Sequence, residues 1–322
     1  MGKCLVTKLS GVSSNNDLLH IGELRIGVNK KSDPSENRSI DFQFSKPTTA
    51  NILGDGYFTD KTYTENKGKE TAFVEQIGTD HTLVYLSDGA YDISVKDKYS
   101  IKTLMVNVPC TFTLEDLKYS KELMRLNLYS NNVIGNIDSL QNMENLYQLS
   151  LNSNNISGSF ESIKALRKLA YFNFYCPNVN ADITFLKDLT ELVSCIITNA
   201  TGDISSLGNL SKMEYFALKN SSLTGDLSVI KGKYAEFSGN ASSFSWTNRT
   251  SDNKILAIAG FPYLGNNVDK MLQDQANCVK GFSDSDDTKF KTIAVKGTKT
   301  PASDAAVTTL QQKGYTVSIT PA

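Results

Sequence analysis

The side chains that most often carry chemistry in proteins are few and scattered in this sequence. Its only histidines are His20 and His81. Its five cysteines are widely spaced and never occur as CxxC: Cys4, Cys110, Cys176, Cys195 and Cys278. Zinc sites need Cys and His at short, regular spacings. We therefore predict no metal site, and we interpret the cysteines as reduced residues buried as small apolar groups.

Motifs for catalysis or cofactor binding are not found either. No GxSxG surrounds a serine nucleophile, and no GxxxxGK[ST] or GxGxxG precedes an expected helix. The run Asp284-Ser285-Asp286-Asp287 could recruit calcium, but it lacks the glycine and final glutamate of an EF-hand loop, so a solvated turn is the other interpretation. We predict no catalytic residue and no cofactor. A carbohydrate-active enzyme or peptidase would need a carboxylate pair or nucleophile that we do not identify.

Tyrosine and asparagine instead recur at one spacing, together with serine and Arg125, and this is the composition of adaptable recognition surfaces. A tyrosine ring supplies contact area at low entropic cost, and polar neighbours supply hydrogen bonds. We predict that the following residues bind protein or glycan: Arg125, Asn127, Tyr129, Gln148, Asn152, Tyr171, Asn173, Tyr175, Tyr215 and Lys219. The alternative is a solvated sheet face whose tyrosines reflect strand propensity.

A repeat positions these residues, because apolar side chains recur every 23 residues. Its clearest copies begin at Leu123, Leu146, Leu169 and Leu192, with weaker copies from Ile101, Met213 and Tyr234. The best copy reads Leu123-x-x-Leu126-x-Leu128-x-x-Asn131-x-Val133-x-Gly135-x-Ile137. Strict spacing with Asn and Gly at fixed places does not suit the 3.6-residue period of amphipathic helices, which are the alternative.

The Leu-x-Leu step of each copy predicts a short strand with one face inward. Stacked copies would then form a parallel sheet around a shared core. The outward residues would form columns on the outer, concave face. At the last copy, our alignment places Glu236 in the column of Tyr215 and Ser238 in that of Ala217.

Turn residues also recur at fixed places in the repeat. We expect the amides of Asn131 and Asn154 to hydrogen-bond the turning backbone, and Gly135, Gly158 and Gly225 to let it bend. With these positions included, LxxLxLxxNxIxGxI resembles the leucine-rich repeats of the plant-type subclass. This resemblance covers residues 101–238 and implies a solenoid that scaffolds recognition.

The two flanks have different patterns. Residues 1–100 are β-rich, with an exposed loop expected at 32–38 and strands at Gly22–Val28, Ser39–Phe44, Thr82–Leu86 and Tyr91–Val95. After residue 238 strands alternate with helices: strand Ile255–Ala259, helix Asn267–Ala276, strand Thr292–Lys296, helix Ala302–Lys313, strand Tyr315–Ile319. We predict an α/β fold with a β-rich amino-terminal anchoring or capping domain (1–100), a leucine-rich-repeat solenoid with a parallel β-sheet (101–238) and a βαβαβ carboxy-terminal cap (239–322).

Short signatures carry a second resemblance. Residues 1–9 (MGKCLVTKL), 266–272 (NNVDKML), 298–307 (TKTPASDAAV) and 314–317 (GYTV) resemble tail- and collar-associated proteins of crAss-like bacteriophages of gut Bacteroidota. This implies a virion fibre or appendage subunit, assembled in the host cytoplasm, that contacts itself as a homo-oligomer and other virion proteins. A host surface protein or glycan is a further partner. The alternative is a bacterial cell-surface leucine-rich-repeat adhesin.

Charge and hydropathy exclude other classes of partner. The chain has 33 Lys and Arg against 34 Asp and Glu, so no bulk charge attracts nucleic acid or an anionic membrane. No apolar stretch has the length of a signal peptide or a membrane span. We therefore predict neither nucleic-acid binding nor membrane insertion, and expect a non-enzymatic structural or binding protein. The adhesin alternative would need a signal peptide or lipobox in the native gene.

Overall fold

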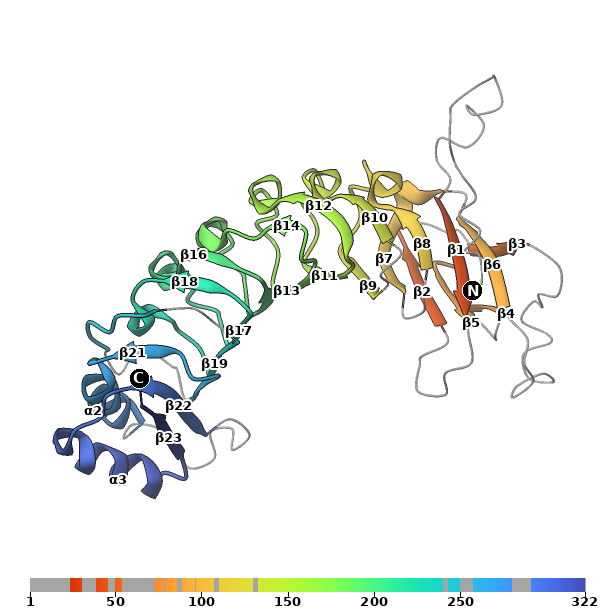
Figure 1. Ribbon diagram of the computed structural model, residues 1–322. Helices are drawn as coiled ribbons and strands as arrows, with labels where there is room; N and C mark the ends of the chain where they lie inside the picture. Colours follow the sequence, from red (N-terminus) through yellow and green to blue (C-terminus); the bar gives the residue numbers. More distant parts are fainter. Residues whose placement is uncertain are drawn as a thin grey trace. The chain divides into compact units, whose positions relative to one another are not determined.

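The computed structural model describes most of the chain (Figure 1). The described residues are 24–30, 39–45, 50–53, 73–77, 79–85, 89–95, 97–106, 110–129, 133–239, 243–249, 257–279 and 291–321. The chain divides into two compact units, residues 1–158 and 159–322. The repeat spans the boundary between them, so each unit contains coils of its own.

Unit 1 is built from two β-sheets. Its strands are β1 (Leu24–Lys30), β2 (Ser39–Phe44), β3 (Ala50–Leu53), β4 (Phe73–Ile77), β5 (His81–Tyr85), β6 (Gly89–Val95), β7 (Ile101–Val106), β8 (Cys110–Thr113), β9 (Arg125–Tyr129), β10 (Val133–Asn136), β11 (Gln148–Asn152) and β12 (Asn155–Ser159), with one-turn helices η2 (Lys98–Ser100), η3 (Leu114–Leu117) and η4 (Ile137–Leu140). Within the unit the sheets run β4-β5-β2-β7-β9-β11 and β12-β10-β8-β1-β6-β3. Antiparallel pairs β2–β7 and β1–β8 join the amino-terminal strands to both sheets.

Leucines of successive coils in unit 1 share one interior. Strands β7, β9 and β11 are parallel, and their registers place Leu104 opposite Leu126 and Leu126 opposite Leu149. All three side chains are fully buried. Burying a leucine contributes about 1.5–3 kcal/mol, so the column supplies much of the coil-to-coil stability. The side-by-side strands predicted from the repeat are confirmed here.

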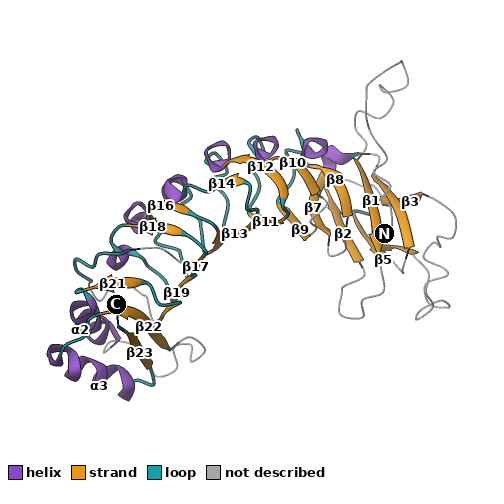
Figure 2. Ribbon diagram, viewed as in Figure 1, coloured by secondary structure: helices purple, strands orange, loops and turns teal. Residues whose placement is uncertain are grey.

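Unit 2 begins with coils of the same kind and ends with βα units. Its elements are η5 (Phe160–Ile163), β13 (Tyr171–Tyr175), β14 (Val179–Asn180), η6 (Ile183–Asp188), β15 (Ser194–Thr198), β16 (Thr201–Asp203), η7 (Ile204–Asn209), β17 (Tyr215–Lys219), β18 (Ser222–Thr224), η8 (Leu227–Val229), β19 (Tyr234–Ser238), β20 (Ala257–Ala259), β21 (Tyr263–Gly265), α2 (Val268–Val279), β22 (Thr292–Gly297), η10 (Pro301–Ser303), α3 (Asp304–Gln312) and β23 (Thr316–Thr320). Its main sheet runs β13-β15-β17-β19-β20-β22, and both β21 and β23 pair with β22. The one-turn helices lie on the side of the coils away from β13–β19 (Figure 2).

The flanking elements agree with expectation in type and differ at their ends. Strand β2 has the predicted bounds, and β1, β5 and β6 shift by one or two residues where they are described. Strands β3, β4 and β21 were not predicted. The carboxy-terminal strands pair in parallel from β19 through β20 and β22 to β23, with α2 and α3 between them, as the βαβαβ prediction requires. The predicted loop at 32–38 and the acidic run at 284–287 lie outside the described residues.

A short 3-10 helix opens the return segment of each coil, and each of these helices after η3 has a side-chain cap. The caps accept a hydrogen bond from the backbone N–H two residues on: Asn136, Ser159, Asp182, Asp203 and Asp226. Gly202 and Gly225 precede two of them at φ of 114° and 109°. A Cβ at Gly225 would overlap Oδ1 of Asp203, the cap of the coil before it. The glycine is therefore required both by its φ and by the cap beneath it.

The turn after β11 is tied to its neighbour by a serine. Asn154 is exposed, whereas Ser153 is buried. The Ser153 hydroxyl donates to the carbonyl oxygen of Val133 on the preceding coil at 2.6 Å and accepts from the N–H of Asn155 at 3.1 Å. Ser153 thus makes a bond between coils that the repeat pattern did not predict, while the backbone hydrogen bond expected of Asn154 stays a prediction. Asn131 lies outside the described residues.

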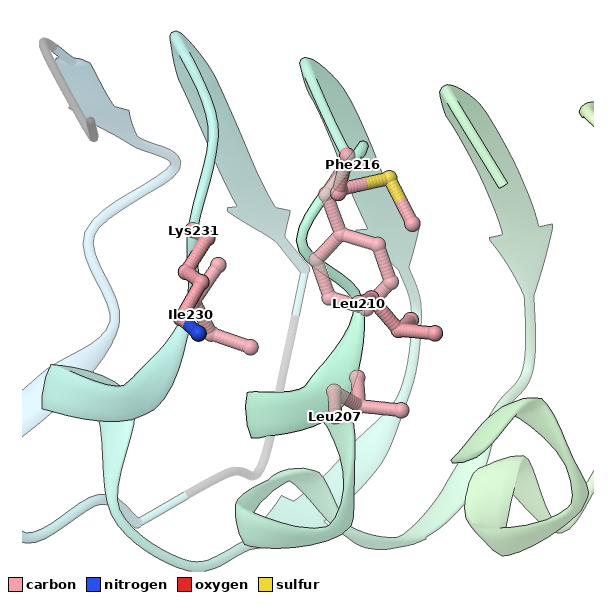
Figure 3. Close-up of a pocket in the computed structure, with 6 residues that line it drawn as sticks. Leu207, Leu210, Phe216, Ile230 and Lys231 are labelled. Atoms are coloured by element: carbon pink, nitrogen blue, oxygen red, sulfur yellow. The ribbon is translucent and has the colours of Figure 1, made fainter. Parts of the chain in front are cut away.

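The last coil of unit 2 has a shortened return segment. Strand register places Gly232 in the position of Met213, so the segment from Leu227 to Gly232 is four residues shorter than that from Ile204 to Met213. A small apolar hollow lies beside Leu210 and this shortened segment (Figure 3). It is lined by Leu207, Leu210, Met213, Phe216, Ile230 and Lys231. Its five apolar lining side chains are at most 5% exposed, so the hollow is packing space and not a ligand site.

Arg249 lies where the stacked coils of unit 2 end. Its guanidinium Nη1 and Nη2 donate to the carbonyl oxygens of Ser228 at 3.2 Å and Ile230 at 2.7 Å. The guanidinium lies 5.8 Å from the ring of Trp246, whose Nε1 donates to Asp274. Burial lowers the pKa of Arg249 to about 10, which still leaves it charged at neutral pH. A buried cation thus satisfies two carbonyl groups of the return segment.

Candidate binding surface

In unit 1 the predicted residues lie side by side on the outer face of β9 and β11. Register pairs Arg125 with Gln148 and Tyr129 with Asn152. The Arg125 guanidinium lies 5.2 Å from the ring centre of Tyr147, and its Nη2 donates to the Tyr147 hydroxyl at 3.2 Å. Stacking on an aromatic ring holds the guanidinium in one orientation. Tyr147 was not predicted because it precedes the strand. The side chain of Tyr129 lies outside the described residues.

Two asparagines of the middle column present buried acceptors. Asn127 in unit 1 and Asn173 in unit 2 each carry a buried side-chain oxygen with no hydrogen-bond partner among the described residues. Leaving such a group unpaired costs about 1–3 kcal/mol. Both oxygens are shielded from solvent, so neither presents an acceptor at the surface of the sheet.

The outer face of unit 2 has a register that corrects our alignment at the last coil. Tyr234, and not Glu236, stands opposite Tyr215, while Glu236 stands opposite Ala217 and Ser238 opposite Lys219. Our alignment starts the last copy at Tyr234, which predicts that this side chain points inward. Strand alternation instead turns Ala235 and Phe237 inward, where both are fully buried, and Tyr234 outward.

This register assembles a polar aromatic cluster from two strands, consisting of Tyr215, Lys219, Tyr234 and Glu236. The Tyr215 and Tyr234 rings stack with centroids 5.0 Å apart and planes 12° from parallel. The Tyr234 hydroxyl donates to Glu236 Oε2 at 3.2 Å, and Glu236 Oε1 lies 3.5 Å from Nζ of Lys219. We call these four residues the outer-face cluster. It combines a ring platform, a carboxylate and a cation on adjacent positions.

The acid–base chemistry of the cluster follows from its partial burial and its carboxylate. Burial, reinforced by the negative charge of Glu236, raises the pKa of Tyr234 to about 12. The same two causes raise the pKa of Tyr215 above its ordinary value. Both phenols are therefore protonated at neutral pH and can donate hydrogen bonds. The cluster therefore presents neutral phenol groups to a binding partner at that pH.

The remaining predicted residues of unit 2 lie on β13. Tyr171 is 40% exposed, and Asn173 and Tyr175 are half-buried. Register places Ser194 between Tyr171 and Tyr215, so these two tyrosines occupy one column but are not neighbours. Of the ten predicted residues, Tyr215 and Lys219 are the two in the cluster. Tyr234 and Glu236 complete it, and the correct register of the last coil would have identified them.

The potential metal ligands of the sequence lie apart. The described cysteines form no disulfide with one another and are buried: Cys110, Cys176, Cys195 and Cys278. Burial raises the pKa of the Cys195 thiol. His81 Nε2 lies 2.9 Å from Asp41 Oδ1, and His20 and Cys4 are outside the described residues. No group of three His, Cys, Asp or Glu side chains in the described part could hold a metal ion. No described helix has the length and apolarity needed to cross a membrane.

The comparisons with known proteins gave structural similarities. No family model matches the sequence, and no curated protein matches it. An internalin (InlF) from Listeria monocytogenes is 16% identical over 71% of this chain and 85% of its own, with a TM-score of 0.39. Internalin C2 from the same organism is 19% identical over 45% and 75%, with a TM-score of 0.32. A plant ice-binding protein is 22% identical over 45% and 59%, with a TM-score of 0.32.

We therefore assign the fold from the strand pairing, side-chain burial and helix caps of this chain. Parallel strands in register, a fully buried leucine column and capped return segments are its defining features. These features make the fold a leucine-rich-repeat solenoid.

Proposed function

We propose that the chain is a non-enzymatic structural or binding protein that contacts protein or glycan through the outer face of its parallel strands. The outer-face cluster carries this proposal. Its stacked rings offer a flat apolar platform for a sugar ring or an apolar side chain. The Glu236 carboxylate and the Lys219 ammonium beside them would fix the orientation of a bound group. Measurable turnover abolished by a single Asp or Glu substitution would contradict the non-enzymatic part.

Binding of the fluorescently labelled full chain to intact Bacteroidota cells, measured by flow cytometry, tests the role of this face. We expect the double variant Tyr215→Ala/Tyr234→Ala to reduce binding at least about tenfold, because aromatic anchors dominate such interfaces. Lys187→Ala is the matched control, since Lys187 is exposed and belongs to η6, outside the strands. Equal binding by the double variant and the control would contradict the proposal, provided that both fold.

We further propose that the protein is a tail or collar appendage subunit of a bacteriophage virion, made in the host cytoplasm and assembled with itself and with other virion proteins. The resemblance of residues 1–9, 266–272, 298–307 and 314–317 to such proteins supports this. In this arrangement residues 1–100 anchor the subunit, 101–238 present the binding face and 239–322 cap the coils. A bacterial cell-surface adhesin would use the same face.

Immunogold labelling with an antibody against the full chain separates these two settings. Label on purified phage particles supports the appendage subunit, whereas label on phage-free cells supports the adhesin. The codons upstream of the native gene give an independent test, because a signal peptide or lipobox there would favour the adhesin.

A further inference from the structure

Strand β23 forms an edge of the main sheet in unit 2. Among the described residues it pairs with β22 alone, in parallel. The N–H of Thr316 donates to the carbonyl oxygen of Lys291, which shows that this amide points toward β22. Amide directions alternate along a strand, so Ser318 and Thr320 also point to β22, while Val317 and Ile319 point to the open edge.

The side chains of this strand do not protect the edge. Its sequence, Thr-Val-Ser-Ile-Thr, contains no charge and no proline, the two devices that most often block edge-to-edge pairing. Four of the five residues are also β-branched, a side-chain type that favours strands. The edge is therefore a template for a further strand.

The apolar row that crosses the sheet is also incomplete at this edge. Ile293 and Val295 of β22 are fully buried. Register places Val317 and Ile319 beside them, and both of these side chains are only partly buried. A strand added at the open edge would cover them and complete the row.

We infer that a second copy of this chain pairs with β23 through the open edge, in an antiparallel arrangement about a two-fold axis at Ser318. The strand fits itself in this arrangement. Val317 of one copy stands opposite Ile319 of the other, and the two residues exchange both of their outward hydrogen bonds. Symmetry doubles this to four bonds, and each copy covers the exposed apolar side chains of the other.

The contact is small and does not depend on the outer-face cluster. Two strands of five residues bury much less than the roughly 1,200–2,000 Å² of a stable interface, so the dimer is weak in solution and depends on concentration. A symmetric assembly that holds the copies close together would increase the fraction of copies paired through β23.

Sedimentation velocity of the full chain over a range of concentrations tests the inference. We expect the wild type to move from monomer toward dimer as concentration rises. Ile319→Pro removes one outward N–H without removing a bond to β22, and proline is tolerated at such an edge position. It should weaken dimerisation at least about tenfold, because the symmetric dimer loses two hydrogen bonds. The matched control Ile319→Val has a side chain of similar size and keeps the N–H, and should stay within a few-fold of wild type.

A wild type that remains monomeric at every concentration would overturn the inference, as would equal dimerisation by the proline and valine variants. If Ile319→Pro fails to fold, amide hydrogen exchange of the wild type gives the answer. The amides of Val317 and Ile319 should exchange more slowly at high than at low concentration, whereas concentration-independent exchange would overturn the inference. The variant Tyr215→Ala/Tyr234→Ala should dimerise like wild type, so failure of this contact and failure of the proposed function are distinguishable.

Discussion

Replacing Gly225 with alanine tests the link between each turn and the coil before it. Gly225 has a φ of 109°, a conformation that alanine adopts only with strain of about 1–3 kcal/mol. The new Cβ would overlap Oδ1 of Asp203, which accepts the N–H of Ser205 at 2.8 Å to cap η7. Displacing that cap costs about 1 kcal/mol more. We therefore expect Gly225→Ala to destabilise the protein by roughly 2–4 kcal/mol.

Gly208→Ala is the matched control for this substitution. Gly208 lies in η7, the helix that Asp203 caps, without a positive φ, and a Cβ there would meet only Val229, at an ordinary 3.5 Å. The control should be neutral or slightly stabilising, because alanine reduces the conformational entropy of the unfolded chain. Thermal unfolding followed by circular dichroism measures both variants, with about 2–4 °C expected per kcal/mol.

Two results would refute this reasoning. Equal unfolding midpoints for Gly225→Ala and Gly208→Ala would show that neither φ nor the cap matters at the turn. Alternatively, Asp203→Ala could add its full cost in the Gly225→Ala background. Since the glycine substitution already displaces the cap, we expect the double variant to lose clearly less than the sum of the single losses.

Three other predictions concern the core, the cluster and pH. Leu149→Asp, at a fully buried position, should unfold unit 1, because the lost packing and a buried charge together exceed about 5 kcal/mol, whereas Tyr175→Ala should melt like wild type. Glu236→Gln should lower the pKa of Tyr234 from about 12, seen as phenolate absorbance appearing at lower pH, and an unchanged titration would exclude the Coulombic contribution. Burial raises the pKa of Asp226, but hydrogen bonds outweigh it and the net pKa lies below the usual value. Its stability contribution is complete above the unfolded pKa of about 3.9 and is lost as pH falls through the folded pKa, so Asp226→Asn should show a shallower loss of stability from about pH 5 to 2 in urea titrations.

The coils could be predicted from the sequence because their core is local and periodic. Leu126 and Leu149 lie one period apart, and stacking them requires only that each coil repeat the path of the one before. The prediction failed where the period changed. The return segment after Leu227 is shorter, and Gly232 stands where the preceding coil has the apolar Met213. Tyr234 therefore looks in the sequence like the inward residue that begins a copy. Only the alternation within β19 resolves this, and it also reveals half of the outer-face cluster.

The amino-terminal strands were harder to predict because their pairing is not local. Strand β2 lies between β5 and β7, and β1 lies between β6 and β8, so partners are far apart in the chain. No repeat in the sequence indicates which of these strands pair. Strand β4 did have a local signal, since Gly78, Thr79 and Asp80 separate it from β5 as a short hairpin loop would. The repeat pattern gave no sign of the hydrogen bonds that buried Ser153 and Arg249 make to backbone carbonyl oxygens.

The guanidinium at the end of the unit 2 coils also limits how the protein can change in length. A duplicated coil inserted among β13–β19 would contain its own helix-capping residue. Its strand would pair in the same parallel register with the strands on both sides. A coil inserted directly after β19 would instead separate Arg249 from the carbonyl oxygens of Ser228 and Ile230. The buried guanidinium would then lose these two hydrogen-bond acceptors. Growth of this array by gene duplication is therefore confined to its interior.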